Sequence, residues 1–444
     1  MMRALMLALF LLALPAHLPA HAQDLQQVYR DAKGYDALYA AARYALQAGR
    51  EKLPQGRALI LPTLNLSGNA TNTRTETEPH NSTVGPTTLR DARSYGYSLS
   101  FSQPVYRRQN TLQYSQSETQ VKQAEATFGQ AGQDLIVRVA QAYFDVLAAQ
   151  DTLALVQAQK AAISEQLAQA KRNFEVGTAT ITDTHEAQAR FDLSSSQEIA
   201  AQSDLETKRR ALQQITGKEY AALRPLPPQV RLTPPNPANM QSWVDIAEKQ
   251  GYPVQIQESA TEIAQLEARR QAAGHYPTVD LVASYGWTSQ TASQLSAVPS
   301  NVTSGVFGVQ LGLPIFQGGA ISSREREAAA LYEKSRQDLE NARRSQALTA
   351  RQTYLSVTNG IAQVGALEQA LVSSQSALDS NKLGYEVGVR INIDVLNAQQ
   401  QLFSTRRDLA VARYNTITSH LRLKAAAGSL RDEDLEEVNR ALAP

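Results

Sequence analysis

The strongest constraint on the fold of this chain is an internal repeat. Residues 385–399 read YEVGVRINIDVLNAQ and residues 174–188 read FEVGTATITDTHEAQ, with six of fifteen positions identical, no gap and an offset of 211. Upstream, LPTLNLSGNA (61–70) matches YPTVDLVASY (276–285). A chain of 444 residues with the same order of parts in both halves is expected to form one elongated architecture built from two similar units.

A proline-rich segment marks the boundary between the two halves. Six prolines fall between residues 223 and 237, and because proline lacks a backbone donor and clashes with the preceding turn, no helix should continue through them. Each half is expected to contain a helix, a β-hairpin and two long helices joined at a tip. The predicted parts are a first repeat at 23–222 (β-hairpin 61–104, tip 177–183), a linker at 223–239, and a second repeat at 240–444 (β-hairpin 276–316, tip 388–394).

The longest predicted helix begins near Arg107 and ends near Val176. It contains no proline, its only glycines are Gly129 and Gly132, and apolar residues recur in it with the 3-4 spacing of a coiled-coil seam. Its seventy residues would reach roughly 105 Å, far more than a globular core requires. The seam positions are Ala142, Val146, Ala149, Leu153, Val156, Lys160, Ile163, Leu167, Ala170 and Phe174.

Four segments alternate apolar side chains with small or polar ones, which predicts β-strands. In SYGYSLSFS (94–102) the tyrosines, Leu99 and Phe101 alternate with glycine and serine. Residues 64–69, 279–287 and 307–313 follow the same pattern. The alternation fits either a soluble antiparallel sheet with one buried face or a lipid-facing β-barrel.

Four strands are too few to close a barrel, because single-chain barrels in membranes need at least about eight. Open sheet edges are not tolerated in lipid. If these strands contact lipid, several copies of the chain must share one barrel. The segments 70–92 and 288–304, rich in Ser, Thr and Asn, are predicted to be the polar loops that join the strands of each pair.

The first residues are predicted to be a cleaved secretory signal, residues 1–22. Arg3 precedes an apolar run from Ala4 to Leu14, and Ala20-His21-Ala22 fits a cleavage site. No later stretch approaches eighteen apolar residues, so we expect no transmembrane helix in the mature chain. The chain has no cysteine, which excludes disulfides, thiolate metal sites and a cysteine-linked lipid anchor, and its net charge of +1 gives no reason to expect nucleic acid as a partner.

In each copy of the repeated phrase a glycine is predicted to end one helix and an aspartate to begin the next. Glycine accepts the left-handed conformation common at helix C-termini, and aspartate favours N-termini. Glu186, three residues after Asp183, resembles the partner residue of a capping box. The copies differ in that Phe174 corresponds to Tyr385 and Ala179 to Arg390, which gives the second copy two hydrogen-bond donors.

The order and spacing of these parts resemble the TolC family of outer-membrane channel-tunnels over essentially the whole mature sequence. The resemblance rests on the twofold repeat and on AQAYFDVL, FEVGTATITD, LPIFQGG, YEVGVRINIDVLNAQ and ARYNTITSHLRLKAAAGSL. It implies an α+β membrane protein: a homotrimer whose chains each give four transmembrane strands to a shared twelve-stranded β-barrel, with a long antiparallel coiled-coil helical barrel extending into the periplasm.

The resemblance also implies a function and partners. The protein would be the outer-membrane exit duct of tripartite efflux pumps or type I secretion systems, and would pass drugs or proteins. Its partners would be a periplasmic adaptor (membrane fusion) protein, an inner-membrane transporter of the RND, ABC or MFS class, and outer-membrane lipid. No cofactor, metal or nucleic acid is implied.

The resemblance also implies which residues at the two predicted tips form a gate, an aperture and a docking surface. Contacts at the periplasmic entrance would keep it closed until they break. Asp394 would line the narrowest aperture, where Asn397 replaces a second aspartate that is common in the family. The implied positions are Thr182, Asp183, Tyr385 and Arg390 for the gate, Asp394 and Asn397 for the aperture, and Val176, Gly177, Val387 and Gly388 for adaptor docking.

Two other classes of protein fit parts of the sequence less well. An enzyme is disfavoured because the histidines outside the signal are widely separated without HExxH spacing. ITGK (215–218) is not a P-loop, since position 212 is not glycine and Glu219 follows in place of Ser or Thr, so no catalytic residue is predicted. A soluble periplasmic coiled-coil adaptor or scaffold protein would explain the long helices. It would not explain the alternating aromatic strands or the twofold repetition.

Overall fold

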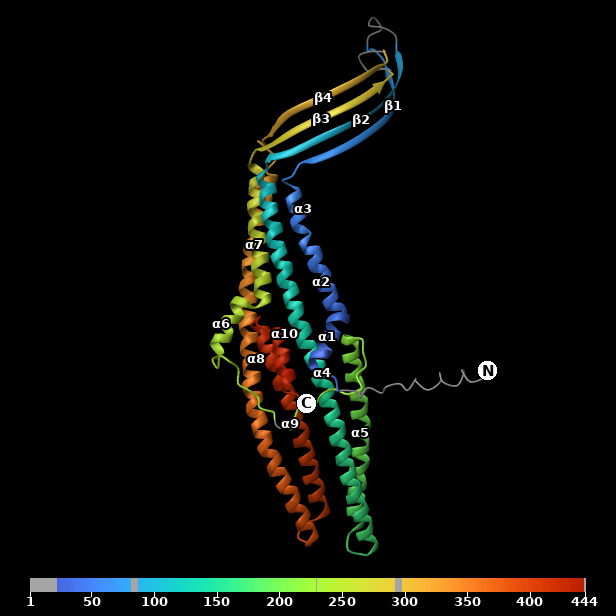
Figure 1. Cartoon of the computed structure of the whole chain (residues 1–444), viewed down its shortest axis with the longest axis vertical. Coiled ribbons are helices and arrows are strands. Elements are labelled where there is room, and N and C mark those ends of the chain that lie inside the picture. The colour runs from blue at the N-terminus through green and yellow to red at the C-terminus, as the bar shows by residue number, and fades with distance from the viewer. Residues whose placement is uncertain (1–21, 81–86, 229, 292–297, 443–444) are drawn as a thin grey trace, which may run out of the picture. The chain divides into compact units, whose positions relative to one another are not determined.

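The computed structural model describes residues 22–80, 87–228, 230–291 and 298–442 (Figure 1). The predicted signal therefore lies, except for Ala22, outside the described residues. The described chain divides into two compact units, each of which draws on both halves of the sequence. The first unit comprises the described parts of 1–44, 127–254 and 342–444, and the second comprises those of 45–126 and 255–341.

The elements follow the order expected for each half: helix, two strands, very long helix, helix. The first half contains α1 (Leu25–Tyr35), α2 (Ala37–Arg50), α3 (Lys52–Ala58), β1 (Thr63–Thr77), β2 (Thr88–Tyr106), α4 (Arg108–Glu175) and α5 (Ile181–Thr216). The second contains α6 (Met240–Gln250), α7 (Tyr252–Ala272), a 3₁₀ turn (Ala273–His275), β3 (Thr278–Gln290), β4 (Ser300–Gly312), α8 (Ala320–Glu386), α9 (Asn392–Ala426) and α10 (Asp432–Arg440). Between α5 and α6, no helix occurs in the described residues of the proline-rich segment.

The predicted bounds of the two polar loops, 70–92 and 288–304, are wrong, because the strands extend into both segments. β1 continues to Thr77 and β2 already begins at Thr88, with pairing from Ala70↔Tyr95 out to Thr77↔Thr88. In the second pair, β3 ends at Gln290 and β4 begins at Ser300. Threonine favours strands, and a polar strand needs only backbone pairing to form, so polarity alone did not distinguish these strand ends from loops.

The second unit contains one antiparallel four-stranded sheet in the order β1-β2-β3-β4. Its register places Leu66 opposite Leu99, Leu99 opposite Tyr285, and Ala283 opposite Phe307. Residues directly opposite each other share a face, so the predicted apolar positions of all four strands lie on one side of the sheet. The other face carries mostly small residues such as Gly96, Ser98, Ser284, Gly286 and Gly308.

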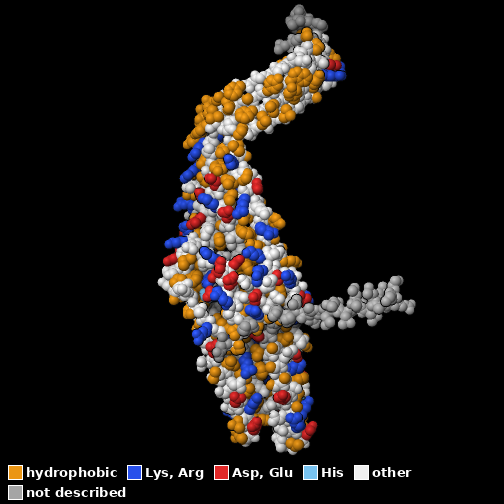
Figure 2. Space-filling view, viewed as in Figure 1, with side chains coloured by type: hydrophobic (Ala, Val, Ile, Leu, Met, Phe, Trp, Pro, Cys, Tyr) orange, Lys and Arg blue, Asp and Glu red, His pale blue; other side chains and the backbone are white. Residues whose placement is uncertain are grey.

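The apolar face of this sheet is uncovered. Leu66 is 74% exposed, Phe307 76% and Val309 68%. Figure 2 shows hydrophobic side chains over the strands and few charged ones, whereas charged side chains are frequent over the helices. Contiguous apolar surface of this extent is typical of a membrane or protein contact. In the described part of the chain, no helix is both long and apolar enough to cross a membrane.

The long helices are continuous, as the absence of proline predicted. α4 has 68 residues and α8 has 67. The predicted seam positions of α4 are buried or half-buried up to Ala170, and only Phe174, at the end of the helix, is exposed.

The core of the first unit joins α1, α4, α5, α9 and α10. Tyr143 and Phe144 of α4 lie at its centre, and Phe144 packs against Tyr414 of α9 with their ring centroids 5.7 Å apart. The Tyr143 hydroxyl donates to the backbone oxygens of Gln23 (3.1 Å) and Arg224 (2.9 Å). This one side chain therefore ties the segments before α1 and after α5 to α4.

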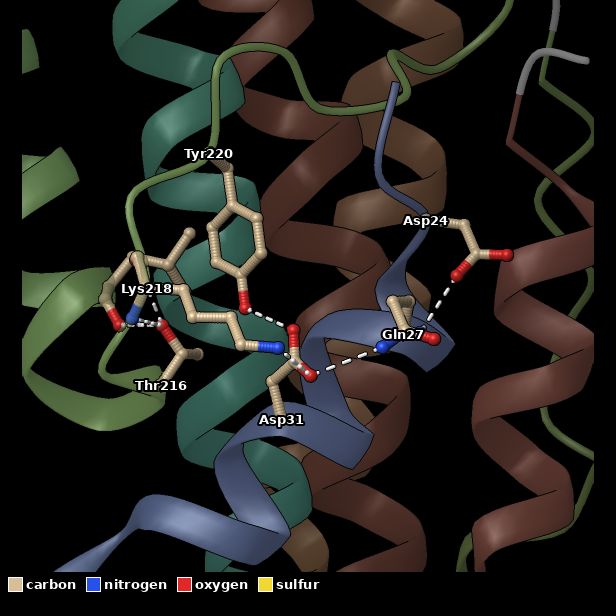
Figure 3. Close-up of polar contacts among 7 residues, drawn as sticks. Asp24, Gln27, Asp31, Thr216, Lys218 and Tyr220 are labelled. Carbon is tan, nitrogen blue, oxygen red and sulfur yellow. Dashed lines mark hydrogen bonds and ion pairs between the residues drawn. The ribbon is translucent and has the colours of Figure 1, made fainter. Parts of the chain in front are cut away.

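Asp31 adds polar contacts between α1 and the segment that follows α5 (Figure 3). Its carboxylate accepts from Lys218 Nζ (2.8 Å), the Tyr220 hydroxyl (3.0 Å) and Gln27 Nε2 (3.1 Å). Burial, together with the neighbouring carboxylate, raises the pKa of Tyr220 to about 12, so this hydroxyl stays protonated and continues to donate at neutral pH.

In the second unit, Glu267 of α7 forms a comparable group of hydrogen bonds, one of which joins α7 to α4. It accepts from Arg270 Nη2 (2.7 Å), Gln271 Nε2 (2.6 Å) and the buried Gln116 of α4 (3.0 Å). The hydrogen bond from Arg270 is the largest cause that lowers the pKa of Glu267 to about 2, against an ordinary value of 4.5.

The pH dependence of stability should report this carboxylate. Because its pKa is lower in the folded state, its stabilisation is present above pH 4.5 and is lost as the pH falls toward about 2. The melting temperature of the wild-type protein should fall across that window, and Glu267→Gln should flatten the fall. Glu262→Gln, at an exposed position of the same helix, is the matched control and should leave the pH dependence of the melting temperature unchanged. Parallel melting curves for Glu267→Gln and the wild type would contradict this account.

Candidate functional site: the tips of the two helical hairpins

Both tips belong to the first unit and share one backbone design. Gly177 between α4 and α5 has φ +78°, and Gly388 between α8 and α9 has φ +80°. The amide of Thr178 donates to the oxygen of Asn173, and the amide of Val389 donates to the oxygen of Gly384, both at 2.8 Å. These bonds close the C-termini of α4 and α8 in the manner of a Schellman motif, which requires the left-handed glycine.

The two tips differ in how the next helix begins. Thr180 is the N-cap of α5 and forms a capping box with Asp183: the Asp183 carboxylate accepts from the Thr180 amide (2.9 Å), and the Thr180 hydroxyl accepts from the Asp183 amide (3.3 Å). The expectation that Asp183 starts the box and Glu186 completes it was therefore wrong by one turn. At the second tip the N-cap is Ile391, which has no side-chain oxygen to cap α9.

The predicted gate residues do not bond to one another within a single chain. The carboxylate of Asp183 caps its own helix, and Arg390 lies 3.7 Å from Asp394 in its own hairpin. The Tyr385 hydroxyl accepts from Asn173 Nδ2 at 3.2 Å. Thr182 is exposed.

The predicted aperture residues lie in the first turns of α9. The Asp394 side chain is half-buried beside Arg390. Asn397 is exposed, and its Oδ1 accepts from Arg190 Nη2 of α5 at 2.9 Å. Arg190 Nη1 donates in addition to Oε1 of Gln400.

The predicted docking residues are exposed apolar side chains and the two turn glycines. Val176 is 73% exposed and Val387 64%, and Val389 and Ile391 extend this apolar surface at the second tip. An added Cβ would meet no atom within 4 Å at Gly177 or Gly388, so these glycines are required by backbone conformation and not by crowding.

The two hairpins contact each other just above the tips. Leu167 of α4, Ala187 of α5 and Leu396 of α9 belong to one small buried cluster. The polar contacts beside it are Asn173 with Tyr385, and Arg190 with Asn397 and Gln400.

Sequence reasoning missed Asn173, Arg190 and Gln400. The signal was available in the repeat, because Asn173 corresponds to Gly384 and Arg190 to Gln401 at the offset of 211. The contacts between the hairpins lie on either side of the segment from the turn glycine to the aspartate, and not within it.

The described residues contain no group of three or more His, Asp or Glu side chains placed to hold a metal ion. The contacts described at the tips are hydrogen bonds, one ion pair and exposed apolar surface.

Comparison with known proteins identifies the family. The sequence profile of outer membrane efflux proteins matches residues 28–218 and 253–429. The chain belongs to this family. It is 32% identical to the outer membrane protein TolC of Vibrio cholerae over 424 residues, covering 95% of this chain and 94% of the relative. It is 33% identical to the alkaline protease secretion protein AprF of Pseudomonas aeruginosa, covering 94% of this chain and 87% of that one.

The solved structures agree on the fold. The outer membrane protein VceC of Vibrio cholerae superposes with a TM-score of 0.77 at 20% identity, covering 91% of this chain and 96% of that one. The predicted family, the fold of long helices with a four-stranded sheet and the outer-membrane location are thus confirmed. The family is one of channel and transport proteins.

The capping asymmetry leads to a testable difference between the two aspartates. Asp183→Ala should accelerate hydrogen exchange of the first-turn amides of α5 roughly fivefold, because loss of the capping box costs about 1 kcal/mol. Asp394→Ala is the matched control: it removes the corresponding aspartate without removing a cap bond, so the first turn of α9 should keep its exchange rates. Equal acceleration at both tips would contradict the assignment.

Proposed function

We propose that this protein is the outer-membrane exit duct of an efflux pump or a type I secretion system. The observation that carries the proposal is an uncovered apolar sheet in a chain that also contains two long helical hairpins with exposed tips. The names of the relatives support both kinds of cargo, because the family is named for efflux and AprF for protease secretion.

The sheet supports assembly of several copies of the chain, and the family resemblance implies that there are three. β1 and β4 each have one edge without a partner strand among the described residues. In lipid these backbone groups must be paired, and four strands are too few to close a barrel. Three copies would contribute twelve strands to one closed barrel, with the apolar face of each sheet toward lipid.

The tips support a regulated periplasmic entrance. The donors Tyr385 and Arg390 do not reach Asp183 or Thr182 within one chain, so the proposed gate contacts form between neighbouring copies. Asp394 contributes an acidic ring at the aperture, and Asn397 adds no charge to it. Since Arg390 lies 3.7 Å from Asp394, part of that ring's charge is compensated within each chain.

The proposed partners come from the family resemblance, and the tips offer a surface for one of them. The exposed valines beside Gly177 and Gly388 offer apolar contacts to the helical hairpins of a periplasmic adaptor. An inner-membrane transporter of the RND, ABC or MFS class would load the duct. The alternative, a soluble periplasmic adaptor or scaffold, would leave the apolar face of the sheet in water, where such surface is unfavourable.

The two faces of β4 allow a direct test of the barrel. Val309 lies on the exposed apolar face, and Val309→Lys should cost about 2–4 kcal/mol if this face meets the middle of a bilayer. Gln310→Lys, the matched control one residue along, points to the other face and should be tolerated. The measurement is the amount of heat-sensitive trimer in the outer-membrane fraction. A wild-type protein found as a soluble monomer, or equal yields of the two variants, would overturn the proposal.

The gate is tested by conductance. The double variant Tyr385→Phe with Arg390→Ser should raise single-channel conductance in planar bilayers severalfold, because the donors of the proposed contacts between copies are lost. Asn173→Ala is the control, since it removes only the bond to Tyr385 within the chain. Unchanged conductance in the double variant would refute the gate residues, and an equal rise in Asn173→Ala would assign Tyr385 to the contact within the chain.

A further inference from the structure

Arg190 joins the two hairpins by a contact that the proposed gate does not use. Its guanidinium donates from Nη2 to Oδ1 of Asn397 at 2.9 Å and from Nη1 to Oε1 of Gln400. The two acceptors are three residues apart on α9, so they lie on one face of that helix. A planar guanidinium with two parallel donors matches such a pair of amide oxygens.

We infer that Arg190 is a second restraint on the periplasmic entrance, which holds the beginning of α9 against α5 inside each chain. The inference rests on the proposed function, because it assumes an entrance that opens. In this contact the hydrogen-bond donor lies in the first hairpin and the acceptors lie in the second. In the proposed gate the donors lie in the second hairpin and the acceptors in the first. The two sets of contacts share no residue.

Near the tips, α9 contacts the first hairpin at only a few places. Beside it, Leu396 packs into the small cluster with Leu167 and Ala187. Further from the tips, a groove of about 470 Å³ separates α9 from α4 and α5, lined by Val156, Asp204, Phe403 and Arg407 among others. Above the groove the helices meet again in the main core at Tyr414. The segment of α9 between the tip and the groove is therefore held to the first hairpin by the hydrogen bonds of Arg190 and by the packing of Leu396 and Ile393.

The face of α9 that packs against α8 contains buried polar groups that favour movement of α9 away from α8. Asn392 and Gln399 are 1% and 4% exposed, and with Val395 and Leu402 they follow the 3-4-3 spacing of a coiled-coil seam. Neither amide atom of Asn392, nor Oε1 of Gln399, has a hydrogen-bond partner in the described chain. Buried polar atoms without partners are costly, and movement of α9 would let water reach them. The packing of α9 against α8 is thus less stable near the tip. The contact of Arg190 with α9 compensates for this loss of stability.

The identity of residue 397 sets the strength of this restraint. Asparagine offers Arg190 a neutral acceptor. An aspartate at the same place would form an ion pair with Arg190, and charge-assisted pairs between two ions are stronger than those with a neutral amide. The neutral side chain of Asn397 therefore adds no charge to the proposed aperture and also makes the contact between α5 and α9 easier to break than an aspartate would.

Single-channel recording tests the inference. Arg190→Ala should raise the ratio of open to closed time roughly fivefold, the order expected for loss of two exposed hydrogen bonds. Arg172→Ala, an exposed arginine of α4 without a contact to the second hairpin in the described chain, is the matched control and should leave the ratio unchanged. Asn397→Asp should lower the ratio, and Arg190→Ala should cancel that effect when the two are combined. Asn392→Leu should also lower it, because it replaces the orphaned amide by an apolar side chain.

Cross-linking provides a second readout that does not depend on loss of a side chain. The chain has no native cysteine, so Arg190→Cys with Asn397→Cys introduces only two thiols. A short bis-maleimide should join them within one chain, seen as a monomer on denaturing gels, and should reduce conductance. The inference is overturned if Arg190→Ala behaves like Arg172→Ala, if the cross-link joins two chains, or if it leaves conductance unchanged. Failure of the proposed function would be seen separately, as a wild-type protein that forms no channel.

Discussion

The unpaired edges of the four-stranded sheet are the constraint on which the rest of the structure depends. β1 and β4 each leave one row of backbone donors and acceptors without partners among the described residues, and the apolar face between them is exposed. Water would satisfy the edges but not the face, and lipid would satisfy the face but not the edges. In the proposed assembly, copies of the chain pair their edges within the lipid, which would satisfy both the edges and the apolar face. β2 ends at Tyr106 and α4 begins at Arg108, so strand passes directly into helix on that side of the sheet.

The internal repeat supplies two similar hairpins, and the contacts between them depend on the positions where the copies differ. Identical hairpins would place the same donors and acceptors against each other. The turn glycine does not diverge, because Gly177 and Gly388 hold the same left-handed conformation and the amides after them make the same bonds. Divergence occurs at the N-caps Thr180 and Ile391, and at Asn173 and Arg190. The shared residues build the turns, and the unshared ones determine how the hairpins meet.

The sequence was sufficient to predict the elements whose periodicity is long and strict. The seam of α4 and the alternation from Tyr95 to Phe101 identified helix and strand, because burial or lipid contact imposes a regular pattern on side chains. The outer ends of the strands were missed, since Thr- and Asn-rich strands outside the apolar zone carry no such pattern. At the tips the turn glycines were predictable from backbone physics alone. The difference between Arg190 and Gln401 was visible in the repeat, but the partners of Arg190 were not predictable, because they lie 207 and 210 residues away in the sequence.

The small residues on the second face of the sheet have a consequence for transport. In the proposed barrel, Gly96, Ser98, Ser284, Gly286 and Gly308 line the lumen, and such side chains neither narrow it nor present charges. A passing molecule would meet mostly backbone, hydroxyl groups and water along this part of its route. Such a wall does not discriminate between a small amphiphile and an unfolded polypeptide. Selection must therefore be completed before cargo enters the barrel, and the same outer segment could serve several transporters without change.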